Sequence, residues 1–182
     1  MSNMTKEFVI NVNIRSNKFS LMRGKNLLSE NNIFPEPGES IRLVSPAGGF
    51  SSCCVVMALA EQARINKVNI STLRVGKKEM RALRTLNIPD VSICLGGIAL
   101  ENAKKYDYAR YMEHAVENWG WKAVYMRNHS KIILLDTDRG KITIETSSNF
   151  NENPQIEQFC VTNDDSVYDF YFEEFKRLGA WE

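Results

Sequence analysis

Apolar and polar positions along the chain follow two periods, one typical of β-strands and the other typical of α-helices. Short apolar runs predict strands, at residues 41–45, 68–75, 91–95, 141–145 and 157–162. Apolar residues at helical spacing predict helices, at residues 77–86 and 106–119, with two more that begin near Ser51 and Ser166. The last of these is expected to bury Phe170 and Leu178. Because strands alternate with helices, the pattern favours the α/β class, with a mixed β-sheet flanked by helices.

Residues 132–135, Ile-Ile-Leu-Leu, are apolar at every position, which is typical of a strand buried on both faces. His129 and Lys131 come just before this run, and residues two apart on a strand point to the same face. A lysine at the mouth of a buried strand is costly to desolvate unless an anion or a hydrogen-bond network meets it, and a phosphate would meet it well. The neighbouring imidazole can attack phosphorus or carry protons near neutral pH.

This arrangement resembles the signature of the phospholipase D superfamily, H-x-K-x4-D followed by G-S-x-N. His129, Lys131 and Asp136 stand at the family spacing, and Ser147 and Asn149 match the second part. The resemblance is clearest between about residues 121 and 162, whereas upstream only the order of strands and helices agrees. It implies a phospholipase D-like fold.

Three further features of this region bear on the resemblance. Glu157 matches the acidic residue that the family usually carries after the asparagine, although it could also be an ordinary surface acid. Thr146 replaces the family glycine, which puts the tightness of the phosphate loop in doubt. The hairpin from Asp136 to Ser147 is about three residues longer than usual, and we expect the extra length in a surface turn at residues 137–140.

The resemblance also implies a chemistry, that of a metal-independent phosphodiesterase with a phosphohistidine intermediate on His129. Lys131 and Asn149, with help from the Ser147 hydroxyl, would hold the phosphoryl oxygens, and Glu157 would orient His129 and favour its cationic form. No cofactor and no metal are implied, because lysine and histidine supply the positive charge that a metal would.

The chain has one copy of the H-x-K motif. Short single-copy members of the family obtain the second copy from a two-fold partner, so the resemblance implies a homodimer with one shared cleft. His129 of one subunit would attack phosphorus, and the same residue of the other would protonate the leaving oxygen and then activate water.

Each of these positions also has a purely structural interpretation. His129 and Lys131 could form a solvated strand end, with the lysine extending past the apolar run. Ser147 and Asn149 could belong to an ordinary strand-to-loop turn. For Asp136 the structural role is the expected one, because the residue falls at the hairpin and would stabilise it.

Composition narrows the class of substrate in part. The 182 residues carry a net charge of +1 and are 43% hydrophobic, an ordinary balance for one globular domain. Seven cations between residues 64 and 84 face a single acid, Glu79. This asymmetry favours either a solvated helix face or a basic surface that follows a phosphate backbone. We therefore expect a nuclease acting on DNA or RNA, or an enzyme for a small phosphodiester, and keep a non-catalytic nucleic-acid binder and a phospholipid hydrolase as alternatives.

The cysteines and the lack of a visible targeting signal indicate the cellular compartment in which the protein is expected. The four cysteines show no zinc spacing and are expected to be reduced, at positions 53, 54, 94 and 160. No signal peptide or run of transmembrane length is visible, so a cytoplasmic protein without stable membrane association is expected. The Pro-Glu-Pro-Gly run at residues 35–38 predicts a break between an N-terminal extension of unassigned role, residues 1–36, and a single domain, residues 37–182.

Overall fold

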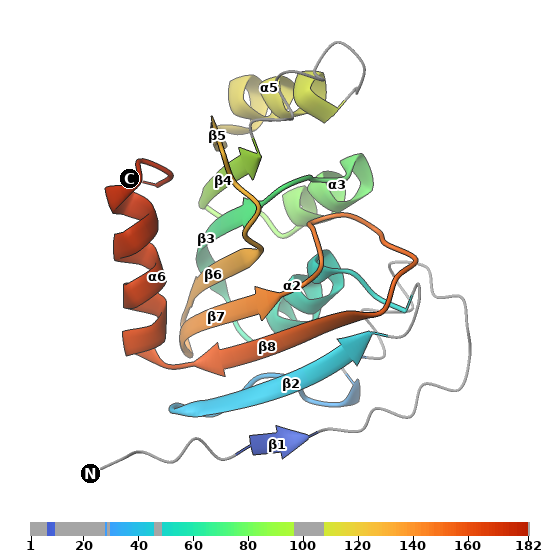
Figure 1. Cartoon of the computed structure of the whole chain (residues 1–182), viewed down its shortest axis with the longest axis vertical. Helices are drawn as coiled ribbons and strands as arrows, with labels where there is room; N and C mark the ends of the chain where they lie inside the picture. Colours follow the sequence, from blue (N-terminus) through green and yellow to red (C-terminus); the bar gives the residue numbers. More distant parts are fainter. Residues whose placement is uncertain (1–6, 10–27, 29, 46–48, 97–107, 182) are drawn as a thin grey trace.

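The computed structural model describes residues 7–9, 28, 30–45, 49–96 and 108–181 (Figure 1). Its strands are β1 (Glu7–Val9), β2 (Glu39–Ser45), β3 (Ile65–Thr72), β4 (Asp90–Gly96), β5 (Lys122–Met126), β6 (Ile132–Thr137), β7 (Gly140–Thr146) and β8 (Glu157–Asn163). Its helices are α2 (Ser52–Ala60), α3 (Lys77–Thr85), α5 (Tyr108–Trp119) and α6 (Asp165–Arg177). None of these described helices combines the length and the apolar character needed to cross a membrane.

The strands form one eight-stranded sheet in the order β1-β2-β8-β7-β6-β3-β4-β5. The β1–β2, β3–β4 and β4–β5 pairs are parallel, and the other pairs are antiparallel. Helices lie on both sides of this sheet (Figure 1). The predicted fold class, a mixed sheet flanked by helices, is therefore confirmed.

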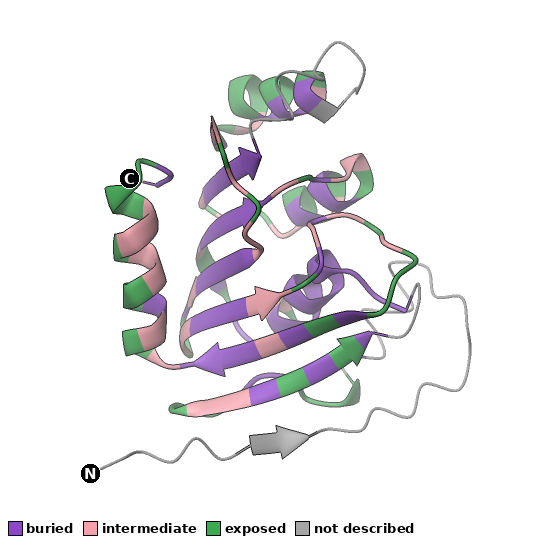
Figure 2. Cartoon of the chain, in the orientation of Figure 1, coloured by how far each residue is buried: buried purple, intermediate pink, exposed green. Residues whose placement is uncertain are grey.

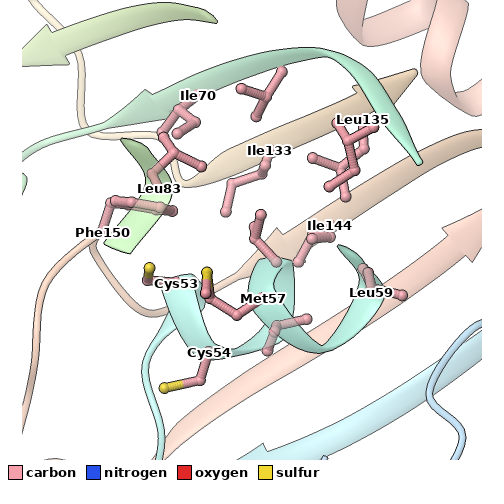
Figure 3. Close-up of a cluster of buried hydrophobic side chains, with 14 of the residues drawn as sticks. Cys53, Cys54, Met57, Leu59, Ile70, Leu83, Ile133, Leu135, Ile144 and Phe150 are labelled. Atoms are coloured by element: carbon pink, nitrogen blue, oxygen red, sulfur yellow. The ribbon is translucent and has the colours of Figure 1, made fainter. Parts of the chain in front are cut away.

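The two faces of the sheet are covered to different extents. The side of α2, α3 and α5 holds the larger core, in which Leu83, Ile133 and Ile144 are at most 2% exposed (Figure 3). On the other side, residues of α6 such as Tyr168 pack on Leu134 in a smaller cluster. Over β2 and β8 this second face is partly exposed, as the alternating colours of β2 show (Figure 2).

Strand β6 lies inside the sheet, between β3 and β7. Ile133 and Leu135 belong to the larger core, while Ile132 and Leu134 belong to the α6 side. The prediction of a strand buried on both faces is confirmed. The motif residues at 129 and 131 lie in the loop before the strand and not on it, because pairing with β3 and β7 begins at Ile132.

Three local features differ from the sequence analysis. Residues 122–126, for which no strand was predicted, form the edge strand β5 and pair with β4. Asp164, and not Ser166, caps α6, because its carboxylate accepts the backbone N–H groups of the second and third residues that follow it. Phe170 and Leu178 are 60% and 67% exposed instead of buried.

The hairpin between β6 and β7 also differs from expectation. Thr137 pairs with Gly140 across a turn of only two residues, Asp138 and Arg139. Gly140 has a φ of +127°, a conformation that L side chains rarely adopt. The extra length of the hairpin therefore lies in paired strands and does not form a larger surface loop.

The described residues before Pro37 join the same sheet and the same core. β1 pairs with β2, and Leu28, Ile33 and Phe34 are buried in the larger core. The Asn163 side chain on β8 donates a hydrogen bond to the Pro35 carbonyl at 3.0 Å. Residues 8–14 alternate loosely between apolar and polar side chains, as in a strand, and residues 10–14 of this run lie outside the described residues.

The core predicts a matched pair of substitutions. Ile144→Ala should lower the free energy of unfolding by about 2 to 5 kcal/mol, because the side chain is fully buried and leaves a cavity. Ile156→Ala removes the same atoms from a side chain that is 71% exposed and should change it by less than about 0.5 kcal/mol. Urea unfolding measures both, and equal losses would contradict the described core.

Candidate active site at the mouth of strand β6

The loop between β5 and β6, which carries the motif histidine and lysine, is anchored by Asn128. The Asn128 amide nitrogen donates to the Ser71 hydroxyl on β3 at 2.8 Å and to the Cys94 carbonyl on β4 at 3.1 Å. Its side-chain oxygen accepts from the backbone N–H of Ser130 at 2.9 Å and from the Ser130 hydroxyl at 2.7 Å. Asn128, to which the sequence analysis assigned no role, thus fixes the loop against the ends of two strands.

The functional groups of His129 and Lys131 lie side by side. Lys131 Nζ is 3.2 Å from His129 Nδ1 and donates to the His129 carbonyl at 2.6 Å. Partial burial lowers the pKa of Lys131, and the negative charge of Glu157 opposes this shift. The imidazole is exposed. A bound phosphate would stabilise the charged lysine, so the pair suits an anionic ligand.

The turn after β7 is tightened by Thr146. Its hydroxyl donates to the Gln158 carbonyl at 2.7 Å and accepts the backbone N–H of Ser148 at 3.0 Å. The Thr146 backbone is outside the left-handed region, so the position does not require glycine. The threonine that replaces the family glycine therefore supports the turn that presents Ser147.

Glu157 is 6% exposed and is held by two side chains. The Ser147 hydroxyl donates to one carboxylate oxygen, and the Asn153 amide donates to the other at 2.5 Å. No hydrogen bond joins Glu157 to His129 in the described structure, so the expected orienting contact is absent within one chain. The carboxylate instead fixes Ser147 and acts on Lys131 through its charge.

Two of the expected site residues lie apart from this group. Asn149 does not line the pocket that contains His129, and its side-chain oxygen is buried without a hydrogen-bond partner in the described structure. Asp136 lies near the far end of β6, with Lys67 and Lys141 as its cross-strand neighbours. That position supports the structural role expected for Asp136.

A pocket of 890 Å³ joins the motif residues to the exposed part of the sheet. Its lining includes polar side chains from five segments, namely Arg42, His129, Lys131, Glu145, Ser147, Gln158 and Tyr171. Arg42 lies opposite Cys160, and Cys160 lies opposite Glu145, so strand pairing brings distant segments into one row. Within the described residues, no three His, Cys, Asp or Glu side chains are grouped as a metal ion would require.

Glu145 and Tyr171 form a hydrogen-bonded pair in this pocket that the sequence analysis missed. The Tyr171 hydroxyl, from α6, donates to the Glu145 carboxylate on β7 at 2.5 Å. Burial, with the neighbouring carboxylate, raises the pKa of Tyr171 to about 12. The alternation of β7 could have identified Glu145 as a residue on the α6 side, but nothing in the sequence places α6 over it.

Comparison with known proteins supports the fold. No family model and no curated protein matches the chain. Among solved structures it is similar to Nuc from Salmonella typhimurium, a phospholipase D family member, with a TM-score of 0.57 and 18% identity over 76% of this chain and 93% of that one. It is also similar to the polyphosphate kinase of Porphyromonas gingivalis (TM-score 0.57, 16% identity, 79% of this chain and 26% of that one). Phosphatidylserine synthase of Haemophilus influenzae Rd KW20 matches with a TM-score of 0.53 and 17% identity, over 76% of this chain and 37% of that one.

These similarities show a fold shared with Nuc, a phospholipase D family member, and so confirm the resemblance at the level of the fold alone. The chain spans 26% of the kinase and 37% of the synthase. Because the identities are below 20%, the comparisons leave the activity of this chain to be argued from its own residues.

Because Glu157 acts on Lys131 through its charge, we expect a substitution of Glu157 to change the pKa of Lys131. Glu157→Gln removes the negative charge that raises the pKa of Lys131, so that pKa should fall further and the ammonium should lose its proton at lower pH. Side-chain NMR of Lys131 measures this directly, and the alkaline limb of any pH–rate profile should move the same way. The control is Glu152→Gln, which removes an exposed carboxylate paired with Lys78. A Lys131 titration that does not move in Glu157→Gln would contradict the predicted coupling.

Proposed function

We propose that this protein is a metal-independent phosphodiesterase, in the first place a nuclease, that works through a phosphohistidine intermediate on His129. The observation that supports this most directly is the approach of Lys131 Nζ to the His129 ring, at 3.2 Å, in a pocket that also contains Ser147. The fold is shared with a phospholipase D family member, and we extend phosphodiester chemistry to this chain from that likeness.

Binding of substrate would release the imidazole for attack. Without substrate, the Lys131 ammonium contacts both the ring nitrogen and the carbonyl of His129. A phosphate would compete for the ammonium and leave the ring free to attack phosphorus and displace the first oxygen. Lys131 and Ser147 would stabilise the charge on the phosphoryl oxygens.

The leaving oxygen needs a proton, and the described residues place one histidine in the pocket. We propose a two-fold homodimer in which His129 of the partner subunit donates that proton and then removes one from water. The hydroxide adds to phosphorus as the phosphorus–nitrogen bond breaks, which regenerates the first imidazole. Each catalytic cycle therefore uses both copies of the residue.

The pocket side of the sheet has exposed apolar side chains for such a partner. Val44 on β2 lines the pocket and is 60% exposed, while Phe170 on α6 and Leu178, directly after α6, are 60% and 67% exposed. A second copy on this face would bury these side chains and close the pocket into a shared cleft.

Alanine substitution of each of the two histidines of the chain tests the catalytic proposal. With EDTA present, His129→Ala should reduce hydrolysis of a chromogenic phosphodiester and of single-stranded DNA by at least about 10²-fold, because both the nucleophile and the proton donor are lost. His114→Ala changes an exposed histidine of α5, outside the pocket, and should leave hydrolysis of the small diester unchanged. Activity that survives His129→Ala would contradict the mechanism. Absence of turnover by a folded wild-type dimer would favour the non-catalytic alternative.

The dimer is tested by charge placed on its proposed surface. Phe170→Glu and Leu178→Glu, both outside the pocket lining, should each yield a monomer by light scattering and lower hydrolysis by about 10²-fold or more, because the site loses its second histidine. Val116→Glu, on α5 and 40% exposed, is the matched control and should remain dimeric. Wild type that is monomeric and fully active would contradict the shared site.

A further inference from the structure

One side of α3 carries a row of cations. Lys77, Arg81 and Arg84 are four and three residues apart, so they follow one another along the same helix face. The row extends about 10 Å along the helix axis. Arg81 and Arg84 are exposed. The row therefore presents a linear series of positive charges to solvent.

Aromatic rings of α5 lie directly against this row. The Arg81 guanidinium carbon is 5.5 Å from the centre of the Tyr111 ring, and that of Arg84 is 5.9 Å from the Trp119 ring. Arg81 Nε also donates to the Tyr111 hydroxyl at 3.0 Å. The ring of the exposed His114 packs at 5.7 Å from Trp119 and extends the aromatic group toward solvent. We call these cations and rings the α3–α5 surface.

Among the described residues, Arg81 and Arg84 of this surface form no ion pair with a carboxylate. The acid of α3, Glu79, is 2% exposed, and burial raises its pKa. Glu113 and Glu117 on α5 are exposed, yet in the described part of the chain neither pairs with Arg81 or Arg84. Like charges four residues apart destabilise a helix, so the positive charge of this row does not stabilise the α3 helix itself. A polyanion would supply the missing negative charge.

Two contacts connect the region of α3 with the segment that follows Ser147. Exposed Arg74 precedes α3, and its carbonyl accepts the backbone N–H of Phe150, the residue after Asn149, at 3.1 Å. Lys78 pairs with Glu152 at 3.1 Å, in the segment between β7 and β8 that passes beside α3 (Figure 1). A linear polyanion bound along these cations would therefore extend toward the turn after β7.

We infer that the α3–α5 surface binds a single-stranded nucleic acid and guides it to the His129 pocket. The inference deepens the proposed function, on which the assignment of this strand as substrate rests. Arginines would contact successive phosphates, and unpaired bases would stack against the imidazole and indole edge of the surface. Duplex DNA keeps its bases stacked inside and would use only the charges.

The test measures binding of a fluorescein-labelled single-stranded oligonucleotide by anisotropy, at several salt concentrations, in full-length protein that carries His129→Ala to prevent cleavage. The double variant Arg81→Gln/Arg84→Gln should bind on the order of tenfold more weakly. Its plot of log K against log salt should be shallower by about 1.4, at about 0.7 per phosphate contact on a single strand. Arg81→Lys/Arg84→Lys keeps the charge and should keep most of the affinity and the slope.

The matched control removes two cations from the opposite face of the sheet. Lys176→Gln/Arg177→Gln changes two exposed residues in the last turn of α6 and should leave binding unchanged. Equal weakening by the two glutamine pairs would overturn the inference. So would loss of binding in the lysine pair, equal affinity for duplex in competition, or binding of anionic phosphatidylserine vesicles in place of the oligonucleotide.

Hydrolysis of the small chromogenic diester separates this inference from the proposed function. With His129 intact, Arg81→Gln/Arg84→Gln should cleave the small diester at the wild-type rate and cleave single-stranded DNA more slowly. If wild type cleaves neither substrate but still binds the oligonucleotide through these arginines, the proposed function fails and the binding surface stands. If the diester is cleaved and the arginines do not affect binding, the proposed function stands and the inference about the α3–α5 surface fails.

Discussion

The double burial of β6 is the constraint on which the rest of the structure depends. Residues 132–135 of β6 are apolar and buried on both faces of the sheet. The strand therefore needs a paired strand on each side and a packed helix on each face. Lys131 directly precedes this buried strand, so its ammonium is partly desolvated and still reaches the pocket. A cation at the position of Ile133 would lie in the larger core, beyond the reach of an anion.

The residues that hold this site in place are mostly uncharged. Asn128 ties the loop before β6 to the ends of β3 and β4, and Thr146 ties the turn after β7 to β8. Both act through hydrogen bonds to neighbouring backbone or hydroxyl groups, on rigid strands. Such a second layer of contacts positions the groups that meet a substrate more accurately than a flexible loop could.

In the proposed function, one face of the sheet forms the dimer and the helices on the opposite face bind nucleic acid. The α6 side contains the pocket and exposed apolar side chains, which suit a second copy of the chain. The opposite side packs three helices over the larger core, and its outer surface at α3 and α5 is basic and aromatic. A homodimer on the first face would leave the second accessible, so assembly and nucleic-acid binding do not compete for the same residues.

The local sequence pattern was sufficient to predict the fold class, the buried strand β6 and the motif at its mouth. Strand periodicity and motif spacing depend only on neighbouring residues, so the sequence alone contains them. The sequence could not show that Glu157 bonds to Ser147 and Asn153, or that Asn149 lies outside the pocket, since side-chain directions at a turn depend on the packed strands around it. Helical spacing likewise placed Phe170 in the core, although α6 covers only part of its sheet face. Arg42, Glu145 and Tyr171 line one pocket because long-range pairing and packing bring β2, β7 and α6 together, and no local pattern encodes those contacts.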